Sequence, residues 1–219
     1  MPDAIILEVL GARAIRHRPQ RNGRAEKAVK PEGCCKTLLA FVGIISVFRA
    51  RNRQNNARKK YFGNKVRIYA LDHDEKTVFE EPQIKTFCGK QADPEFLNKV
   101  INEIGRPDII IDDGSHLQMD LIQTFRMLWP VLNENGIYVV EDTHTAYWDG
   151  WQGGITTPFN FITIVSRWTH DVNLQHIKEP YTPVFNDLKS MSFYDSMVFF
   201  EKEKMVTKVH ESYGPNRVV

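Results

Sequence analysis

Three β-forming segments of the chain each end in acidic residues. The segments at residues 66–71, 108–111 and 137–140 are followed by Asp72, by Asp112-Asp113 and by Glu141-Asp142. Apolar runs such as the last two are typical of parallel strands that are covered on both faces. Crossover connections join strands that run in the same direction, so the carboxyl ends of such strands lie at one edge of the sheet. The sequence therefore predicts a parallel sheet with acids gathered along one edge.

Helical segments separate these strands. Asp93-Pro94-Glu95 marks a helix start, since Asp can cap the first turn and Pro fits its first position. Apolar residues then recur at helical spacing as far as Gly105, and a second helix is predicted at about residues 117–128. A further short strand is predicted at residues 84–87. Alternating strands and helices indicate βαβ units and a doubly wound sheet.

Two strands near the C-terminus complete the predicted sheet. Residues 188–193 and 196–201 have strand character and are joined by a turn at Tyr194-Asp195. An antiparallel hairpin would close the sheet there. The predicted fold is α/β: a Rossmann-like three-layer α/β/α sandwich, with a mostly parallel sheet of about seven strands and a C-terminal antiparallel hairpin.

Charge divides the chain into two predicted segments. Residues 1–60 hold 14 Lys and Arg against 4 Asp and Glu, whereas the remainder carries a balance of −8. This asymmetry predicts a basic N-terminal segment at residues 1–60 and an α/β domain at residues 61–219. The first strand of the sheet has two candidate positions, residues 5–9 and residues 41–48.

Composition excludes several classes of protein. The longest apolar run, residues 38–48, is about half of the ~20 residues that a membrane span needs, so no membrane partner is expected. Three cysteines are too few for a disulfide framework, which favours the cytoplasm. Residues 49–60 hold six Lys and Arg without interleaved aromatic residues, so a solvated helix face or linker is preferred to a nucleic-acid site. Assembly as a homo-oligomer stays open.

The acids at the strand ends form the candidate site, because ligands bind outside the carboxyl ends of strands in an open parallel sheet. Asp113, Glu141 and Asp142 would repel one another unless a hard divalent cation neutralised them. Nearby, His116 can accept a proton from a substrate hydroxyl. Each residue also has a structural alternative, since acids cap helices and histidines pack in turns. Asp112 is expected to be structural, because neighbours on a strand face opposite sides.

Two motifs resemble the macrocin and mycinamicin sugar O-methyltransferases. They are Pro-Asp-Ile-Ile-Ile-Asp-Asp-Gly-Ser-His at residues 107–116 and Gly-Ile-Tyr-Val-Val-Glu-Asp at residues 136–142. Tyr61-Phe62-Gly63, Gly89 with Gln91, and the segments at residues 93–97, 145–148 and 193–196 extend the likeness over residues 61–202. These enzymes use S-adenosylmethionine (SAM) and Mg²⁺ to methylate deoxysugar hydroxyls on macrolide antibiotics.

The resemblance implies a metal site and a base. Asp113, Glu141 and Asp142 would hold Mg²⁺, which would bind two neighbouring hydroxyls of a sugar-like small molecule. Metal binding makes a hydroxyl more acidic, as it does for bound water. His116 would remove the proton, and the oxygen would attack the methyl group of SAM.

The resemblance also implies contacts to the cofactor. Asp72 would bind the ribose hydroxyls of SAM, as an acid does in dinucleotide-binding folds. Gln91 and Asp93 would lie near the adenine, and Asp113 would border the cofactor as well as the metal. The aromatic side chains of Tyr147, Trp148 and Trp151 could form an apolar wall over the substrate.

The sequence departs from the family at the turn after the first strand. Family members have a glycine-rich turn there, because the backbone must approach the cofactor closely. Leu10-Gly11-Ala12-Arg13 follows one candidate strand, and Ser46, Ala50 and Arg51 occupy the corresponding positions of the other. Three explanations stay open: lost SAM binding, an unusual turn, or a misread frame over residues 1–60. The predicted function is a SAM- and Mg²⁺-dependent O-methyltransferase, with a catalytically inactive relative of the same fold as the alternative.

Overall fold

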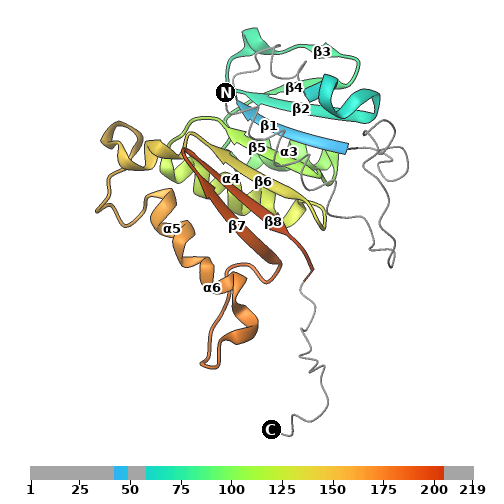
Figure 1. Cartoon of the computed structure of the whole chain (residues 1–219). Helices are drawn as coiled ribbons and strands as arrows, with labels where there is room; N and C mark the ends of the chain where they lie inside the picture. Colours follow the sequence, from blue (N-terminus) through green and yellow to red (C-terminus); the bar gives the residue numbers. More distant parts are fainter. Residues whose placement is uncertain (1–41, 49–57, 205–219) are drawn as a thin grey trace, which may run out of the picture.

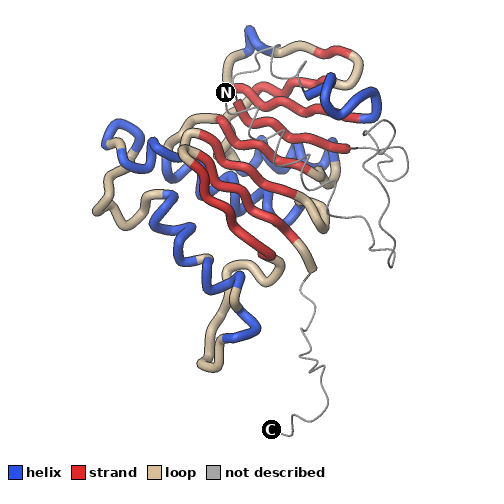
Figure 2. The backbone as a smooth tube through the Cα atoms, viewed as in Figure 1, coloured by secondary structure: helices blue, strands red, loops and turns tan. Residues whose placement is uncertain are grey.

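A single sheet of eight strands organises the described part of the chain. The structure, a computed structural model, describes residues 42–48 and 58–204. The strand order is β3-β4-β2-β1-β5-β6-β8-β7 (Figures 1 and 2). The strands are β1 (Val42–Phe48), β2 (Val66–Asp72), β3 (Glu80–Glu81), β4 (Ile84–Cys88), β5 (Ile109–Asp113), β6 (Ile137–Glu141), β7 (Leu188–Tyr194) and β8 (Met197–Lys202).

Helices connect most of these strands. The α-helices after β2 are α3 (Pro94–Ile104), α4 (Gln118–Leu128), α5 (Phe161–Arg167) and α6 (Thr169–Val172), and residues 58–62 before it are also helical. Short 3-10 helices are η1 (Gly63–Lys65), η2 (Glu75–Thr77), η3 (Trp129–Val131), η4 (Thr143–Tyr147), η5 (Asp149–Trp151) and η6 (Leu174–His176). Among the described residues, no helix combines the length and the apolar character that a bilayer crossing requires.

The predicted topology is confirmed. Strands β4, β2, β1, β5 and β6 run parallel, and the β7–β8 hairpin pairs antiparallel with β6. One strand exceeds the expected seven: β3 pairs two residues, Glu80 and Glu81, antiparallel with β4. So short a strand has no alternation of side chains that a sequence could reveal.

The first strand of the sheet is β1, which lies within the second of the two candidate segments. It pairs with β2 from Val42↔Val66 to Val47↔Leu71 and with β5 from Ile44↔Ile109 to Phe48↔Asp113. The other candidate, residues 5–9, lies outside the described residues. The basic segment at residues 1–60 therefore contributes a central strand, and the division at residue 60 stays a prediction.

The capping residues set the limits of α3 as predicted. Asp93 accepts hydrogen bonds from the backbone N–H groups of Glu95 and Phe96, and Pro94 occupies the first turn. Gly105 ends the helix at φ 75°, a left-handed conformation that glycine adopts without a steric penalty.

Each face of the sheet has its own hydrophobic core. One core joins the sheet to α3, α4 and α5 through residues that include Leu97, Val100, Leu121, Phe125, Phe161 and Val165. Figure 1 shows α3 and α4 lying together behind the sheet. The second core lies on the opposite face and includes Ile44, Ile68, Ile109, Ile111, Val139 and Phe199. Alternate residues of β5 and β6 therefore enter different cores, which decides where the acids at their ends point.

Replacing Phe125 with Ala is expected to lower the free energy of unfolding by about 3–5 kcal/mol. The ring of Phe125 is fully buried and lies 4.6–5.4 Å, between centroids, from the rings of Trp129, Tyr138, Trp168, Phe185 and Phe200. Urea unfolding followed by circular dichroism measures the change. Phe159 is 65% exposed, so Phe159→Ala is the matched control, with an expected change within about 0.5 kcal/mol. Similar losses in both variants would contradict this packing account.

Candidate functional site

The order in which successive strands are added to the sheet reverses at β1. The chain passes from β1 to β2 on one side, and β5 and β6 lie on the other. Ligands of doubly wound sheets bind at such a switch point, outside the carboxyl ends of the strands. Asp72 at the end of β2 and Asp113 at the end of β5 therefore flank the end of β1. The predicted gathering of acids along one edge is confirmed.

Strand alternation puts Asp113 and Glu141 on the same face of the sheet. Ile111 and Val139, two residues earlier on β5 and β6, both belong to the second core. Asp113 and Glu141 each follow the paired residues Asp112 and Val140, so they lie side by side on neighbouring strands.

Asp112 faces the opposite core, as expected from the same alternation. Its carboxylate is fully buried and accepts hydrogen bonds from Gln91 (3.2 Å) and the Tyr138 hydroxyl (3.2 Å). Burial raises the pKa of Asp112 to about 7, although both hydrogen bonds act in the other direction. Asp112 is a structural residue of the core.

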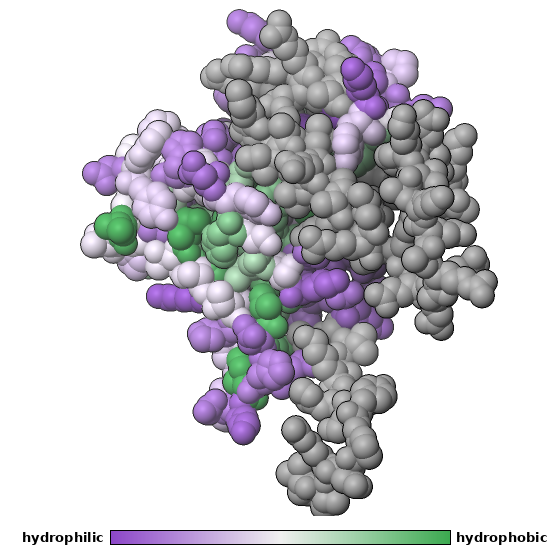
Figure 3. All heavy atoms as spheres, in the orientation of Figure 1, coloured by the Kyte–Doolittle hydropathy of each residue, from purple (hydrophilic) through white to green (hydrophobic). Residues whose placement is uncertain are grey.

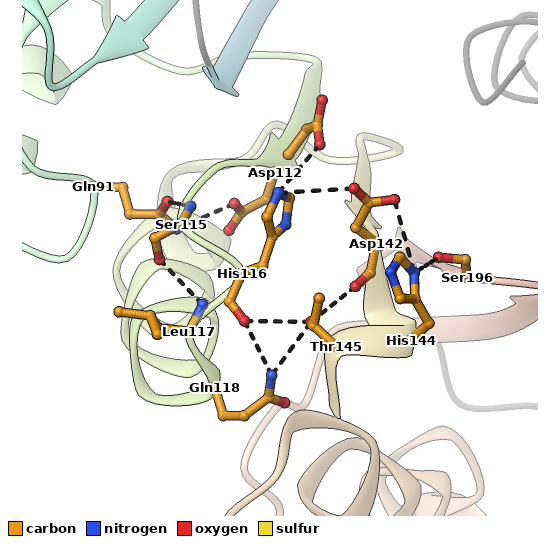
Figure 4. Close-up of polar contacts among 11 residues, drawn as sticks. Gln91, Asp112, Ser115, His116, Leu117, Gln118, Asp142, His144, Thr145 and Ser196 are labelled. Atoms are coloured by element: carbon orange, nitrogen blue, oxygen red, sulfur yellow. Dashed lines mark hydrogen bonds and ion pairs between the residues drawn. The ribbon is translucent and has the colours of Figure 1, made fainter. Parts of the chain in front are cut away.

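Asp113, His116 and Asp142 form a compact cluster at the edge of the sheet. One ligand atom from each lies within 4.8 Å of the others. The Nε2 atom of His116 is 3.8 Å from Asp113 Oδ1 and 3.8 Å from Asp142 Oδ2. Figure 4 shows the imidazole pointing toward the carboxyl group of Asp142. Asp113 ends β5 and His116 lies three residues further on, whereas Asp142 follows β6, so pairing of the two strands brings Asp142 to the other two.

Two residues of this cluster have left-handed backbone conformations. His116 has φ 58° and Asp142 has φ 51°. Such values are uncommon outside glycine and concentrate at functional sites, where the surrounding structure maintains the strain. The turns after β5 and β6 therefore aim these two side chains at each other.

Glu141 is placed differently from the other two predicted metal ligands. Its side chain is 2% exposed at the end of β6, and it is not a member of the cluster found among the described residues. It lies on the same face as Asp113, one residue before Asp142. The structure thus brings together two of the three predicted carboxylates with the predicted base, while Glu141 lies buried beside them.

Burial controls the ionisation of His116. Its pKa is lowered chiefly by desolvation, and also by the nearby His144, whereas Asp142 acts to raise it. The Nδ1 atom is buried without a hydrogen-bond partner among the described residues. A neutral imidazole is the form that accepts a proton, which agrees with the chemistry expected of this residue.

Comparison with known proteins relates the chain to sugar-modifying enzymes. The 8-demethyl-8-alpha-L-rhamnosyl tetracenomycin-C 2'-O-methyltransferase of Streptomyces olivaceus is 34% identical over 149 residues, which are 66% of this chain and 39% of that protein. Demethylmacrocin O-methyltransferase of Streptomyces fradiae is 33% identical over 65% of this chain and 38% of that enzyme. Mycinamicin VI 2''-O-methyltransferase of Micromonospora griseorubida is 42% identical over 43% of this chain and 24% of that enzyme.

Solved structures give the same relationship. The MycE methyltransferase of the mycinamycin biosynthetic pathway, in complex with Mg and S-adenosylhomocysteine (SAH), superposes with a TM-score of 0.69 and 26% identity, covering 75% of this chain and 46% of MycE. The chain is related to the macrocin and mycinamicin sugar O-methyltransferases. It spans less than half the length of these relatives. No protein-family model matches it.

Asp72 and Asp93, two of the residues predicted to bind the cofactor, differ from each other in their surroundings. Asp72 is buried at the end of β2, where its Oδ1 atom accepts a hydrogen bond from the backbone of Asp74 and lies 3.5 Å from His73 Nδ1. Asp93 is exposed at the start of α3 and caps it. Both stand at the carboxyl edge of the sheet, and the capping contact gives Asp93 a structural role.

Gln91 is a buried connector between two loops. Its Oε1 atom accepts a hydrogen bond from the backbone of Ser115 (2.5 Å), and its Nε2 atom contacts Asp112 and Thr124 at 3.2 Å each. These contacts tie the loop after β4 to the loop that carries His116. Gln91 therefore fixes the position of the loop that carries His116, a structural role that the sequence did not reveal.

Gln118 and Thr145 were also missed in the sequence. Gln118 Nε2 donates to the carbonyl oxygen of His116 (3.1 Å), and its Oε1 accepts from the backbone of Phe161 (2.9 Å). The Thr145 hydroxyl lies 2.9 Å from the carbonyl oxygen of Asp142 and 3.3 Å from that of His116. Figure 4 shows this bridge between the two loops. The spacing of Thr145 three residues after Asp142 was the available signal, because it matches a hydrogen-bonded turn.

The segment that follows Asp142 carries exposed aromatic residues. Trp148 and Trp151 are 49% and 37% exposed and lie 5.4 Å apart between ring centroids. Ile155 and Phe159 are exposed further along the segment, and Figure 3 shows hydrophobic side chains among hydrophilic ones on this side of the molecule. The loop returns tightly to η4: a Cβ atom on Gly153 would lie 2.5 Å from the carbonyl oxygen of Thr145.

Proposed function

We propose that this chain carries the catalytic domain of a SAM- and Mg²⁺-dependent O-methyltransferase that acts on a sugar hydroxyl of a natural product. The cluster of Asp113, His116 and Asp142 at the switch point of the sheet is the observation that supports this most. MycE, which shares the fold, has been solved with Mg and SAH, and also with mycinamycin VI.

The donor set fits Mg²⁺. Carboxylate oxygens are the ligands that this ion prefers, with water completing an octahedron. Oxygen ligands on opposite sides of Mg²⁺ lie about 4 Å apart, close to the 4.8 Å that bounds the cluster. Asp113 and Asp142 would hold the ion, and Glu141, on the same face as Asp113, would be the third carboxylate. His116 would remain beside the ion as the base.

The cofactor is expected to bind at the end of β1. Asp72 lies beside that end, since Leu71 pairs with Val47. We propose that Asp72 binds the ribose and that Gln91 and Asp93 border the adenine pocket, with their structural contacts fixing the loops that surround it. Ala50 and Arg51, in the turn expected to contact SAM, lie outside the described residues.

The reaction then follows from the positions of the side chains. Mg²⁺, when bound, makes the substrate hydroxyl more acidic. His116 would take the hydroxyl proton at Nε2, while Asp113 and Asp142 would hold the ion beside the acceptor oxygen. SAM, when bound, would supply the methyl group: the deprotonated oxygen would form a bond to the methyl carbon while the carbon–sulfur bond breaks and SAH leaves. Tyr147 and Trp148 would shield the acceptor from water.

The remaining assignments belong to the same proposal. The domain would comprise residues 61–219, together with the strand supplied by the basic segment at residues 1–60. The protein would work in the cytoplasm on a hydroxylated, sugar-like small molecule, without a nucleic-acid partner, and could form a homo-oligomer. The catalytically inactive alternative keeps the fold and loses SAM, which the departure from the glycine-rich turn favours.

Titration with SAH separates the two functions. We expect the full chain with Mg²⁺ to bind SAH with a measurable heat in calorimetry, and Asp72→Asn to weaken binding about tenfold or more because a charged hydrogen bond is lost. Glu134→Gln, an exposed change in the turn before β6, is the control and should bind as the wild type does. No heat at high micromolar SAH would support the inactive alternative.

A further inference from the structure

A second imidazole stands on the far side of Asp142. His144 lies in η4, two residues after Asp142, and its Nδ1 atom is 3.9 Å from Asp142 Oδ1. The other carboxylate oxygen, Oδ2, faces His116 at 3.8 Å. The carboxyl group of Asp142 is therefore placed between two imidazole rings, one inside the candidate metal cluster and one outside it.

The β7–β8 turn holds the ring of His144. Its Nδ1 atom lies 2.5 Å from the hydroxyl oxygen of Ser196, as Figure 4 shows. Ser196 has φ 61°, and its carbonyl oxygen accepts a hydrogen bond from the backbone of Thr143 (3.1 Å). Two adjacent residues of η4 thus contact one residue of the turn, so the ring cannot shift without breaking a hydrogen bond.

An aromatic contact fixes the ring from another side. Trp148 packs edge-to-face on His144, with 4.5 Å between centroids and an interplanar angle of 69°. The Asp142 side chain, in contrast, is 42% exposed. An exposed carboxylate samples several rotamers, and the entropy lost when a metal orders it lowers the affinity for the metal. A fixed neighbour that already restricts the carboxylate reduces this loss.

We propose that His144, held in place by Ser196 of the β7–β8 turn, is a positioning residue that orients Asp142 toward the metal. Outer contacts of this kind commonly fix the orientation of ligating side chains, and their loss weakens metal binding about 10- to 100-fold. The inference rests on the proposed metal site. It adds a role for the C-terminal hairpin, which otherwise only closes the sheet.

Mn²⁺ binding, followed by the electron paramagnetic resonance signal of the free ion, tests the proposal without an acceptor substrate. His144→Phe keeps a ring against Trp148 but removes the nitrogen, and it is expected to raise the Mn²⁺ dissociation constant about tenfold. His144→Gln keeps a polar group and should lose less affinity. Equal losses in the Phe and Gln variants would overturn the role of the nitrogen contact, as would unchanged affinity in His144→Phe.

The role of the hairpin has its own test. Ser196→Ala should also weaken Mn²⁺ binding. The double variant with His144→Phe should bind Mn²⁺ no more weakly than His144→Phe alone, because both changes remove the same contact between His144 and Ser196. Additive losses would show that Ser196 does not act through His144 and would overturn this role of the hairpin. His170→Phe, on α6, is the matched control and should bind as the wild type. A wild-type chain that fails to bind Mn²⁺ overturns the proposed metal site itself, whereas normal binding unaffected at His144 overturns this inference alone.

Discussion

Replacing Asp113 with Asn is expected to lower the rate of Mg²⁺-dependent methyl transfer by about 10³-fold or more. The substitution keeps the size of the side chain and removes its charge. Asp113 stands in the cluster with His116 and Asp142 and shares a face of the sheet with Glu141. In the proposed site, loss of one carboxylate would therefore remove a ligand from the hard oxygen set that would hold the ion.

Single-turnover assays with labelled SAM and a panel of deoxysugar glycosides, mycinamicin VI among them, measure this effect. Mn²⁺ titration of the same variant shows whether the ion is lost, independently of any acceptor. Glu134→Gln removes a carboxylate from the exposed turn before β6 and should leave the rate unchanged. An Asp113→Asn enzyme that keeps its rate in the presence of a chelator would end the case for a metal-assisted reaction.

Replacing His116 with Asn is expected to slow methyl transfer about 10²- to 10⁴-fold while leaving Mn²⁺ and SAH affinity close to that of the wild type. Asn adopts left-handed conformations more readily than most residues, so it suits the φ of 58° at this position. The variant loses the nitrogen at the Nε2 position, which lies 3.8 Å from each carboxylate of the cluster.

The split between rate and affinity distinguishes a base from a packing residue. A base affects the proton transfer, whereas a packing residue would alter folding and ligand affinity together. Unchanged single-turnover kinetics would return His116 to a structural role, and His170→Phe provides a histidine substitution outside the site for comparison.

Local patterns in the sequence were sufficient for most of the fold. Apolar runs of four to six residues, the capping pattern at Asp93 and the stop at Gly105 specify elements whose bounds agree with the structure to within two residues. The same reasoning separated Asp112 from Asp113, because side-chain alternation on a strand is a local property. The two-residue strand β3 carried no such pattern.

The surroundings of the site depend on contacts that no local pattern encodes. Gln91, Gln118 and Ser196 come from three different elements and reach the site only after the sheet has formed. Gln118 has a polar side chain of the kind usually found on the exposed face of a helix, yet it is 1% exposed. Glu141 is 2% exposed and is not a member of the cluster of Asp113, His116 and Asp142, and the spacing of the acids in the sequence did not distinguish it from them.

The bridge formed by Thr145 has a consequence for substitutions in the loop that follows η4. Thr145 connects the carbonyl groups of Asp142 and His116, and its own backbone lies against Gly153. A larger residue at position 153 would push directly on this bridge and disturb the geometry of both reactive side chains. Ile155 and Phe159, which extend into solvent from the same loop, are free of that constraint. Substitutions at positions 155 and 159 should therefore leave the bridge intact, whereas glycine should be retained at 153.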